Sequence, residues 1–281
     1  MTVVRPLSLP RRLLRNPAAA IACGFVLVFV VFALFAPLVA PADPTAQDTA
    51  NLLAAPSSHH LFGTDEFGRD VLSRVVYGSR VSMAAGVLAT LLAMVVAVPL
   101  GLVSGYYRGF LDTVVSRLTD VLLSFPSLIV AIGLAAMLGP SLTTVTVALG
   151  VAQIPAFIRV VRGEVLGVRG LDYIKGAIVD GAGDFTILRG YVLPNVLAPI
   201  IVQATVAVPT AIIGESLLSF LGLGVQPPTP SWGSMLSAAQ GYIIDSPWLS
   251  IFPGVAIVVA TLAFNLLGDG LRDALDPRRG A

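Results

Sequence analysis

The sequence predicts an all-α membrane protein with six transmembrane helices. Three features predict this class: the composition, the apolar runs and the placement of the basic residues. Of 281 residues, 56% are hydrophobic and 12% are charged, whereas ordinary soluble domains carry about 25% charged residues. One soluble core cannot cover so much apolar surface, so a lipid bilayer is the expected surrounding. The net charge of +1 excludes a general basic surface of the kind that binds nucleic acid.

Six apolar stretches approach the length of about 20 residues that spans the hydrocarbon core of a bilayer. They comprise residues 18–40, 81–105, 114–138, 142–161, 196–221 and 249–267. Arg11, Arg12 and Arg15 precede the first stretch, as they would in a signal peptide. That stretch is too long for a typical signal sequence and shows no cleavage site, so we expect it to stay as an anchor. The single cysteine, Cys23, excludes an internal disulfide.

The basic residues predict the orientation. With a cytoplasmic amino terminus, only Arg69, Arg74 and Arg80 of the 17 basic residues fall on the outer side, so the positive-inside rule places both termini in the cytoplasm. The predicted organisation has a cytoplasmic segment at 1–17, a first span at 18–40, an outer loop with an amphipathic helix at 41–80, a five-helix core at 81–268 and a cytoplasmic tail at 269–281. The core includes a cytoplasmic loop at 162–195 and an outer loop at 222–248.

The cytoplasmic loop contains a predicted short helix that begins after a cap at Asp172 and stops at Gly181. Ile174, Ala177 and Ile178 share one face of this helix and would form a small apolar ridge. Such a short helix is useful if it docks into a groove on a partner. The alternative is that the ridge lies on the membrane surface.

A second segment of the same loop, residues 185–193, is expected to begin after a cap at Asp184. Pro194 disfavours helical geometry at Leu193. We therefore expect a break there, which would separate the loop from the fifth span.

On the outer side, residues 69–80 are predicted to form an amphipathic helix that lies on the membrane before the chain re-enters as the second span. His59 and His60 are expected to be a solvated pair, since no third metal ligand is near. Trp232 and Trp248 fall in the last outer loop, where tryptophans often lie at the membrane interface.

Glu215 lies well inside an apolar run, where ionisable groups usually face the bundle interior or water. It is expected either to line a path through the membrane or to make hydrogen bonds near the outer end of its helix.

Several motifs resemble those of one transporter family. The cytoplasmic loop has two small residues, Gly176 and Ala177, then Gly181, and later Leu193-Pro194-Asn195. Residues 62–82 read FGTDEFGRDVLSRVVYGSRVS, residues 214–236 read GESLLSFLGLGVQPPTPSWGSML, and residues 268–278 read GDGLRDALDPR. In this order the chain resembles the C-type permease of dipeptide and oligopeptide ABC importers, with Lys175 where the general importer pattern places Glu.

The resemblance implies a type I ABC-importer permease fold in a bacterial inner or plasma membrane. It implies a non-enzymatic subunit without a cofactor of its own, which pairs with a second homologous permease to form a path for short peptides. An extracytoplasmic binding protein would deliver the peptide. Two ATP-binding subunits, or one fused ATPase chain, would bind ATP and Mg²⁺. Haem, a nickel chelate and glutathione stay open as alternative substrates.

The resemblance also implies roles for particular residues. The ATPase-contacting set consists of Tyr173, Ile174, Lys175, Gly176, Ala177, Ile178, Gly181, Ala182 and Asp184. The candidates for binding-protein docking or an outer gate are Asp65, Arg69, Asp70 and Arg74. Glu215 is the candidate for the path.

Two other classes of protein are weighed against this interpretation. The phosphate-loop pattern GxxxxGK[ST] is absent and the sole lysine precedes a glycine, so this chain does not bind ATP in that way. An intramembrane enzyme is disfavoured because the sequence has no HExxH, no GxSxG and no histidine inside a predicted span. A membrane scaffold is disfavoured by the long, helix-forming cytoplasmic loop, and co-purification with an ATPase would decide that case.

Overall fold

The computed structural model describes residues 16–275, and within them the secondary structure is helical apart from one isolated bridge between Thr64 and Asp70. The segment before residue 16 and the tail after residue 275, both predicted to be cytoplasmic, lie outside the described residues. The larger helices are α2 (Pro17–Val39), α3 (Val71–Tyr107), α4 (Gly109–Leu123), α5 (Ser127–Leu138), α6 (Leu142–Arg169), α9 (Leu193–Phe220) and α11 (Trp248–Leu275). Short elements are α7 (Asp172–Val179), α8 (Asp184–Ile187), the π-helical η1 (Leu188–Val192), α10 (Trp232–Ala238) and η2 (Ala239–Tyr242).

Within the described residues, 5 helices are long and apolar enough to cross a membrane, and the bent pair α4 and α5 makes up to 6. This agrees with the predicted all-α membrane fold, but the run 114–138 is not the continuous helix that we expected. α4 and α5 meet at an angle of 87°. Pro126 has no backbone N–H and disfavours helical geometry at Phe125, so the helix ends before this pair.

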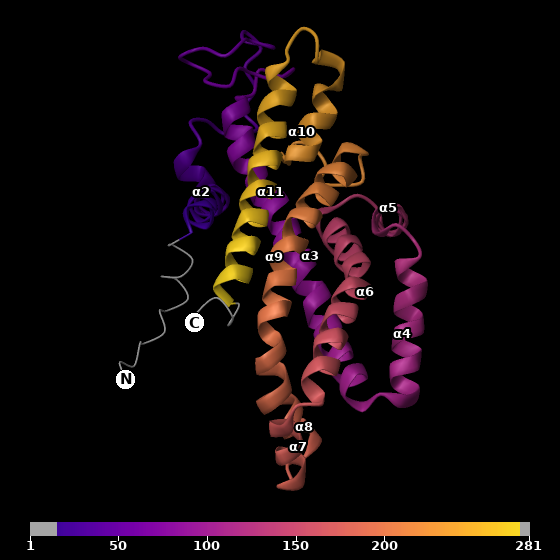
Figure 1. Cartoon of the computed structure of the whole chain (residues 1–281). Coiled ribbons are helices and arrows are strands. Elements are labelled where there is room, and N and C mark those ends of the chain that lie inside the picture. The colour runs from indigo at the N-terminus through magenta and orange to yellow at the C-terminus, as the bar shows by residue number, and fades with distance from the viewer. Residues whose placement is uncertain (1–15, 276–281) are drawn as a thin grey trace, which may run out of the picture.

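α3 corrects a second prediction. No separate surface helix covers residues 69–80, because α3 runs for 37 residues without interruption from Val71. The Asp70 carboxylate accepts a hydrogen bond from the Ser73 backbone N–H at 2.8 Å and caps the helix. The apolar face, with Val71 and Val75, packs into the protein interior rather than onto lipid. In Figure 1, α3 passes behind α9 and α11 along most of the molecule.

Small residues bring the central helices close together. A Cβ atom on Gly101 would lie 2.6 Å from the Val161 Cβ of α6, and one on Gly86 would lie 2.7 Å from the Ile212 Cγ1 of α9. Within a bilayer such close backbone approach favours association, because lipid provides no hydrophobic driving force between helices. α3 therefore forms the centre of the bundle, with α6 and α9 packed directly against it.

α2 lies on one side of this bundle, beside α3 and α11. Its helix is kinked at Phe35, and Pro37 lacks the N–H that would bond to the Ala33 carbonyl four residues earlier. The Arg80 guanidinium donates to that carbonyl at 2.7 Å and to the Leu34 carbonyl at 3.1 Å. A side chain of α3 thus replaces the missing backbone donor of α2.

Trp232 is fully buried, contrary to the interfacial position that we expected for it. Its indole N–H donates to the Val75 carbonyl at 3.0 Å, so it locks α10 onto α3. Trp248 donates more loosely to the Thr64 carbonyl, at 3.3 Å.

The predicted break at Leu193 and Pro194 is also wrong. Residues from Asp184 to Phe220 form one continuous helical rod, and Leu193 keeps helical dihedral angles of φ −54° and ψ −46°. A proline at the first positions of α9 needs no donor of its own there, and the wider π-helical turn η1 leads directly into it. The part of the loop from Asp184 onward is therefore an extension of the fifth span.

Candidate functional site

α7 and α8 form a compact tip at one end of the bundle, opposite α10 (Figure 1). α7 ends as predicted at Gly181, whose φ of +80° suits glycine. The Gly181 N–H donates to the Ile178 carbonyl and the Ala182 N–H to the Ala177 carbonyl, each at 3.0 Å. This pair of bonds is a Schellman motif, which fixes the turn between α7 and α8.

The apolar residues of α7 divide between two faces. Ile174 and Ala177 are 0% and 6% exposed and pack in a cluster with Tyr106, Val165 and Ile187. The expected ridge of Ile174, Ala177 and Ile178 is therefore not a single docking surface, since its first two members face the protein's own bundle. They hold the tip in place instead.

The opposite face of the tip is exposed and apolar. Tyr173 and Ile178 are 42% and 52% exposed, and Val179 and Phe185 are 85% and 73% exposed. Val179 and Phe185 escaped the sequence interpretation, because periodicity does not say which side of a short helix meets the bundle. A Cβ on Gly176 would meet no atom within 4 Å, so the backbone there is open to close approach.

Neither predicted aspartate cap forms. Asp172 is the first residue of α7, and its carboxylate accepts from the Lys175 ammonium at 3.0 Å, in an exposed pair within one helix. Asp184 is the first residue of α8 and accepts from the Tyr106 hydroxyl of α3 at 3.1 Å. Asp184 thereby ties the tip to the end of α3, and Ala182 contributes to the apolar cluster beneath it.

The outer candidates form a buried ionic network. Asp65 pairs with Arg69 at 2.6 Å and with Arg74 at 3.3 Å, and Arg69 reaches Glu66 at 3.0 Å. The guanidinium of Arg74 also donates to the Pro44 carbonyl at 3.0 Å. Since Asp65, Arg69 and Arg74 are each about one-twentieth exposed, they fold the outer loop onto α3.

Asp70, the fourth outer candidate, is buried as the cap of α3. Its second carboxylate oxygen lies 3.1 Å from the His60 Nδ1. We expected His60 to be half of a solvated pair, but it is part of the packed outer loop.

Glu215 is 1% exposed and accepts hydrogen bonds from the Ser82 and Ser219 hydroxyls, both at 2.7 Å. The Trp232 backbone N–H donates to the same Ser82 hydroxyl at 3.4 Å. Of the two roles expected for Glu215, hydrogen bonding near the outer end of its helix matches this geometry. The carboxylate joins α3, α9 and α10 inside the subunit.

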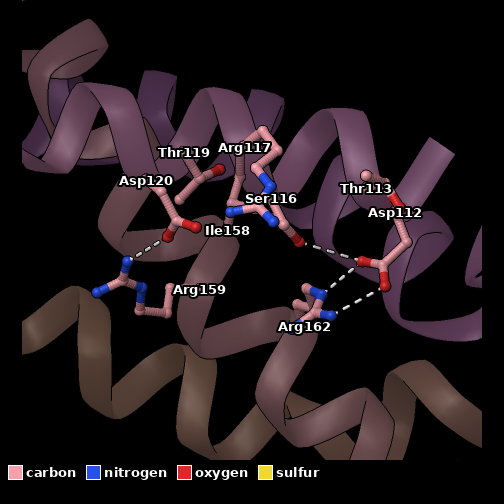
Figure 2. A pocket seen from close by; sticks show the side chains of 9 residues that line it. All are labelled: Asp112, Thr113, Ser116, Arg117, Thr119, Asp120, Ile158, Arg159 and Arg162. Carbon is pink, nitrogen blue, oxygen red and sulfur yellow. Dashed lines mark hydrogen bonds and ion pairs between the residues drawn. The ribbon is translucent and has the colours of Figure 1, made fainter. Parts of the chain in front are cut away.

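A charged pocket between α4 and α6 was missed by the sequence interpretation. It has a volume of about 400 Å³ and is lined by Asp112, Thr113, Ser116, Arg117, Thr119, Asp120, Ile158, Arg159 and Arg162. Figure 2 shows two ion pairs across it: Arg162 forks onto Asp112 at 2.5 and 2.9 Å, and Arg159 reaches Asp120 at 2.8 Å. From the sequence, these residues were treated only as parts of apolar runs or as basic residues of the inner side. Asp112, Ser116 and Asp120 are spaced i, i+4 and i+8 on α4, and this spacing was a usable signal of a polar helix face.

Among residues 16–275, no group of three or more His, Cys, Asp or Glu side chains is placed to hold a metal ion. The described geometry therefore offers a protruding tip, a packed outer loop, an internal carboxylate and one charged pocket.

Comparison with known proteins gives two family matches. Residues 97–280 match the model described as binding-protein-dependent transport system inner membrane component, and residues 10–56 match the N-terminal TM domain of oligopeptide transport permease C. The dipeptide transport system permease protein DppC of Alkalihalophilus pseudofirmus is 42% identical over 95% of this chain and 88% of its own. The glutathione transport system permease protein GsiD of Pectobacterium atrosepticum is 44% identical over 95% and 89%. The di/tripeptide transport system permease protein DppC of Pseudomonas aeruginosa is 43% identical over 90% and 86%.

Proposed function

The chain belongs to the family of binding-protein-dependent transport system inner membrane components, and on that premise we propose that it is a permease subunit of an importer of short peptides. It is a non-catalytic membrane subunit, and the energy for transport comes from ATP hydrolysis on another chain. The observation that carries the proposal is the tip formed by α7 and α8. It is anchored inward by Ile174 and Ala177 and presents Val179 and Phe185 outward.

This tip is the surface on which the ATP-binding subunits dock. A helix of eight residues is too short to be stable alone, so its packing on α3, α6 and α9 keeps it rigid enough to pass on a displacement. Exposed apolar residues of this size favour burial against a partner groove. Of the ATPase-contacting residues implied by resemblance, six are exposed and provide that contact: Tyr173, Lys175, Gly176, Ile178, Gly181 and Asp184. Ile174 and Ala177 support them from behind.

The complete transporter contains a second homologous permease, two ATP-binding subunits or one fused ATPase chain, and an extracytoplasmic binding protein. ATP and Mg²⁺ bind to the ATPase chains. The binding protein docks on the outer face, where the ionic network of Asp65, Arg69 and Arg74 fixes the shape of the loop and exposed neighbours such as Phe67 provide the contact. Beneath that face, Glu215 stabilises the packing of α9 against α3 through its hydrogen bond from Ser82.

The substrate is a di- or oligopeptide. The relatives are named for the transport of dipeptides, di/tripeptides and glutathione, and this chain is similar to each to nearly the same degree. A peptide carries a carboxylate, an ammonium and amide groups, so its path needs charged and polar partners rather than a metal site. Glutathione, haem and a nickel chelate serve as the competing cargoes in the test.

The test is reconstitution of the whole transporter in vesicles, with uptake of a labelled dipeptide, glutathione, haem and a nickel chelate measured in the presence of its binding protein. ATP-dependent uptake of the peptide is expected. Uptake of glutathione, haem or a nickel chelate without uptake of the dipeptide would contradict the proposed substrate. Absence of any ATPase from the purified complex would favour a membrane scaffold.

One variant tests the tip directly. Val179→Arg should weaken capture of the ATP-binding subunits, because it puts a charge into an apolar contact. Ile244→Arg, an equally exposed aliphatic residue of the outer loop, is the matched control and should leave that capture unchanged. Equal capture by both variants would mean that this face of the tip does not dock.

A further inference from the structure

One of the three arginines that line the pocket between α4 and α6 is not paired with an aspartate. Three arginines face two aspartates, and the two aspartates are already engaged by Arg159 and Arg162. Arg117 makes no hydrogen bond or ion pair with another residue in 16–275. Figure 2 shows its side chain between the two ion pairs. The pocket therefore has one uncompensated positive charge near its middle.

The length and the exposure of the charged strip make this charge informative. Asp112 and Asp120 are eight residues apart on α4, so the charged strip extends for about 12 Å along the helix. The Asp120 and Arg159 side chains are 55% and 60% exposed in this subunit. Charged groups at membrane depth avoid lipid and face water or a path through the protein. The side of α4 opposite Ser116 is apolar, with Leu111 and Leu118 exposed, so the strip facing α6 is the part of this helix suited to water.

The chemistry of the lining fits a small zwitterion. A guanidinium binds a carboxylate through two parallel hydrogen bonds, and Asp112 or Asp120 can receive an ammonium group. The hydroxyls of Thr113 and Ser116 add neutral partners beside them. A volume of about 400 Å³ lies within the range of roughly 300 to 1,000 Å³ for sites that hold small molecules.

We propose that this pocket is an inner vestibule that receives the peptide on its way to the cytoplasm, with Arg117 binding the terminal carboxylate. The inference rests on the proposed function, because it takes the short peptide as the cargo. The two ion pairs hold α4 against α6 and keep the aspartates from neutralising Arg117. The terminal ammonium of the peptide then lies near Asp120, whose pairing with Arg159 is solvent-exposed and easily exchanged.

Equilibrium binding from the cytoplasmic side tests the vestibule without the binding protein. The complete permease and ATPase complex, held in lipid nanodiscs, is titrated with a dipeptide and with the same dipeptide amidated at its carboxyl end. The wild type should prefer the free acid by roughly 10- to 100-fold, the range expected for a hydrogen bond between charged groups. Arg117→Gln should abolish this preference, and Arg117→Lys should restore part of it. Arg272→Gln removes a cationic side chain from the far end of α11 and should leave the preference intact.

The outcomes separate the vestibule from the proposed function. The same preparations are assayed for uptake driven by the binding protein. Peptide uptake by the wild type without any preference for the free acid overturns the vestibule alone, whereas failure of peptide uptake overturns the proposed function. Loss of the second permease from the Arg117→Gln complex would show that Arg117 pairs with a carboxylate of that subunit. Displacement of the peptide by anionic lipid would show that the site takes a headgroup. Either result also overturns the vestibule.

Discussion

Replacement of Ile174 by alanine tests whether the tip depends on its inward face. Ile174 is fully buried among Tyr106, Val165 and Ile187, and truncation of a buried isoleucine typically costs about 2 to 5 kcal/mol. α7 is only 8 residues long, so it has little stability of its own to offset that loss. Every 1.4 kcal/mol is a factor of about ten in an equilibrium constant. The open state of α7 should therefore become at least about 30-fold more populated.

Amide hydrogen exchange measures this opening directly. The N–H groups of Lys175, Asp180 and Ala182 bond to carbonyls within or beside α7, so their exchange should accelerate by that factor in Ile174→Ala. The ATPase should lose its stimulation by the binding protein, because a detached tip transmits no displacement. For the exchange measurement alone, Val179→Ala is the matched control: its side chain is 85% exposed, and such surface changes stay within about 0.5 kcal/mol. Unchanged protection of α7 in Ile174→Ala would refute the claim that inward packing holds the tip.

Three further predictions concern topology, the internal carboxylate and the first helix. In a background with Cys23→Ser, a cysteine at Ser58 should react with a membrane-impermeant thiol reagent on intact cells while one at Gly183 stays unlabelled, and the reverse pattern would refute the orientation. Glu215→Gln keeps a carbonyl acceptor for one of the Ser82 and Ser219 hydroxyls and offers an amide N–H to the oxygen of the other, so it should retain assembly and uptake, whereas Glu215→Leu should lower the stability of the complex by about 1 to 3 kcal/mol, seen as a lower melting temperature; lost uptake with normal assembly in the Gln variant would instead assign Glu215 to the path. Arg80→Met removes the donor to the kinked α2 and should loosen that helix, measured as faster cleavage or labelling at its outer end, and an unchanged rate would show that the carbonyl contacts do not hold it.

Hydropathy was sufficient for the parts of the fold that depend on composition. The apolar runs that form most of α2, α3, α6, α9 and α11 are long enough to identify each helix. The stop of α7 at Gly181 was also predictable, because a left-handed residue after a short helix favours glycine.

The features of the fold and the site that the sequence did not predict depend on contacts between segments that are distant in the chain. Ile174 and Val179 are both apolar and close in sequence, and only the position of α3 and α6 makes one a support and the other an exposed contact. Tryptophan often lies at a membrane interface, yet the missing side chain at Gly78 leaves room for the Trp232 ring in the interior, since a Cβ there would lie 3.0 Å from that ring. The charged pocket was hidden because α4 and α6 are far apart in the chain and each looks apolar when averaged over its length.

The central helix α3 and the rod from Asp184 to Phe220 are joined by hydrogen bonds at two well-separated places. The Tyr106 hydroxyl bonds to Asp184 at 3.1 Å, and the Ser82 hydroxyl, in the first third of α3, bonds to Glu215 at 2.7 Å. Each helix has 37 residues, or about 55 Å of length. One helix cannot slide along the other without breaking at least one of these two hydrogen bonds. The two helices must then tilt together, and a tilt of about 10° about the midpoint of a rod of that length moves its far end by about 5 Å. A displacement of the tip formed by α7 and α8 would therefore reach the opposite end of the bundle as a change of angle, in the opposite direction.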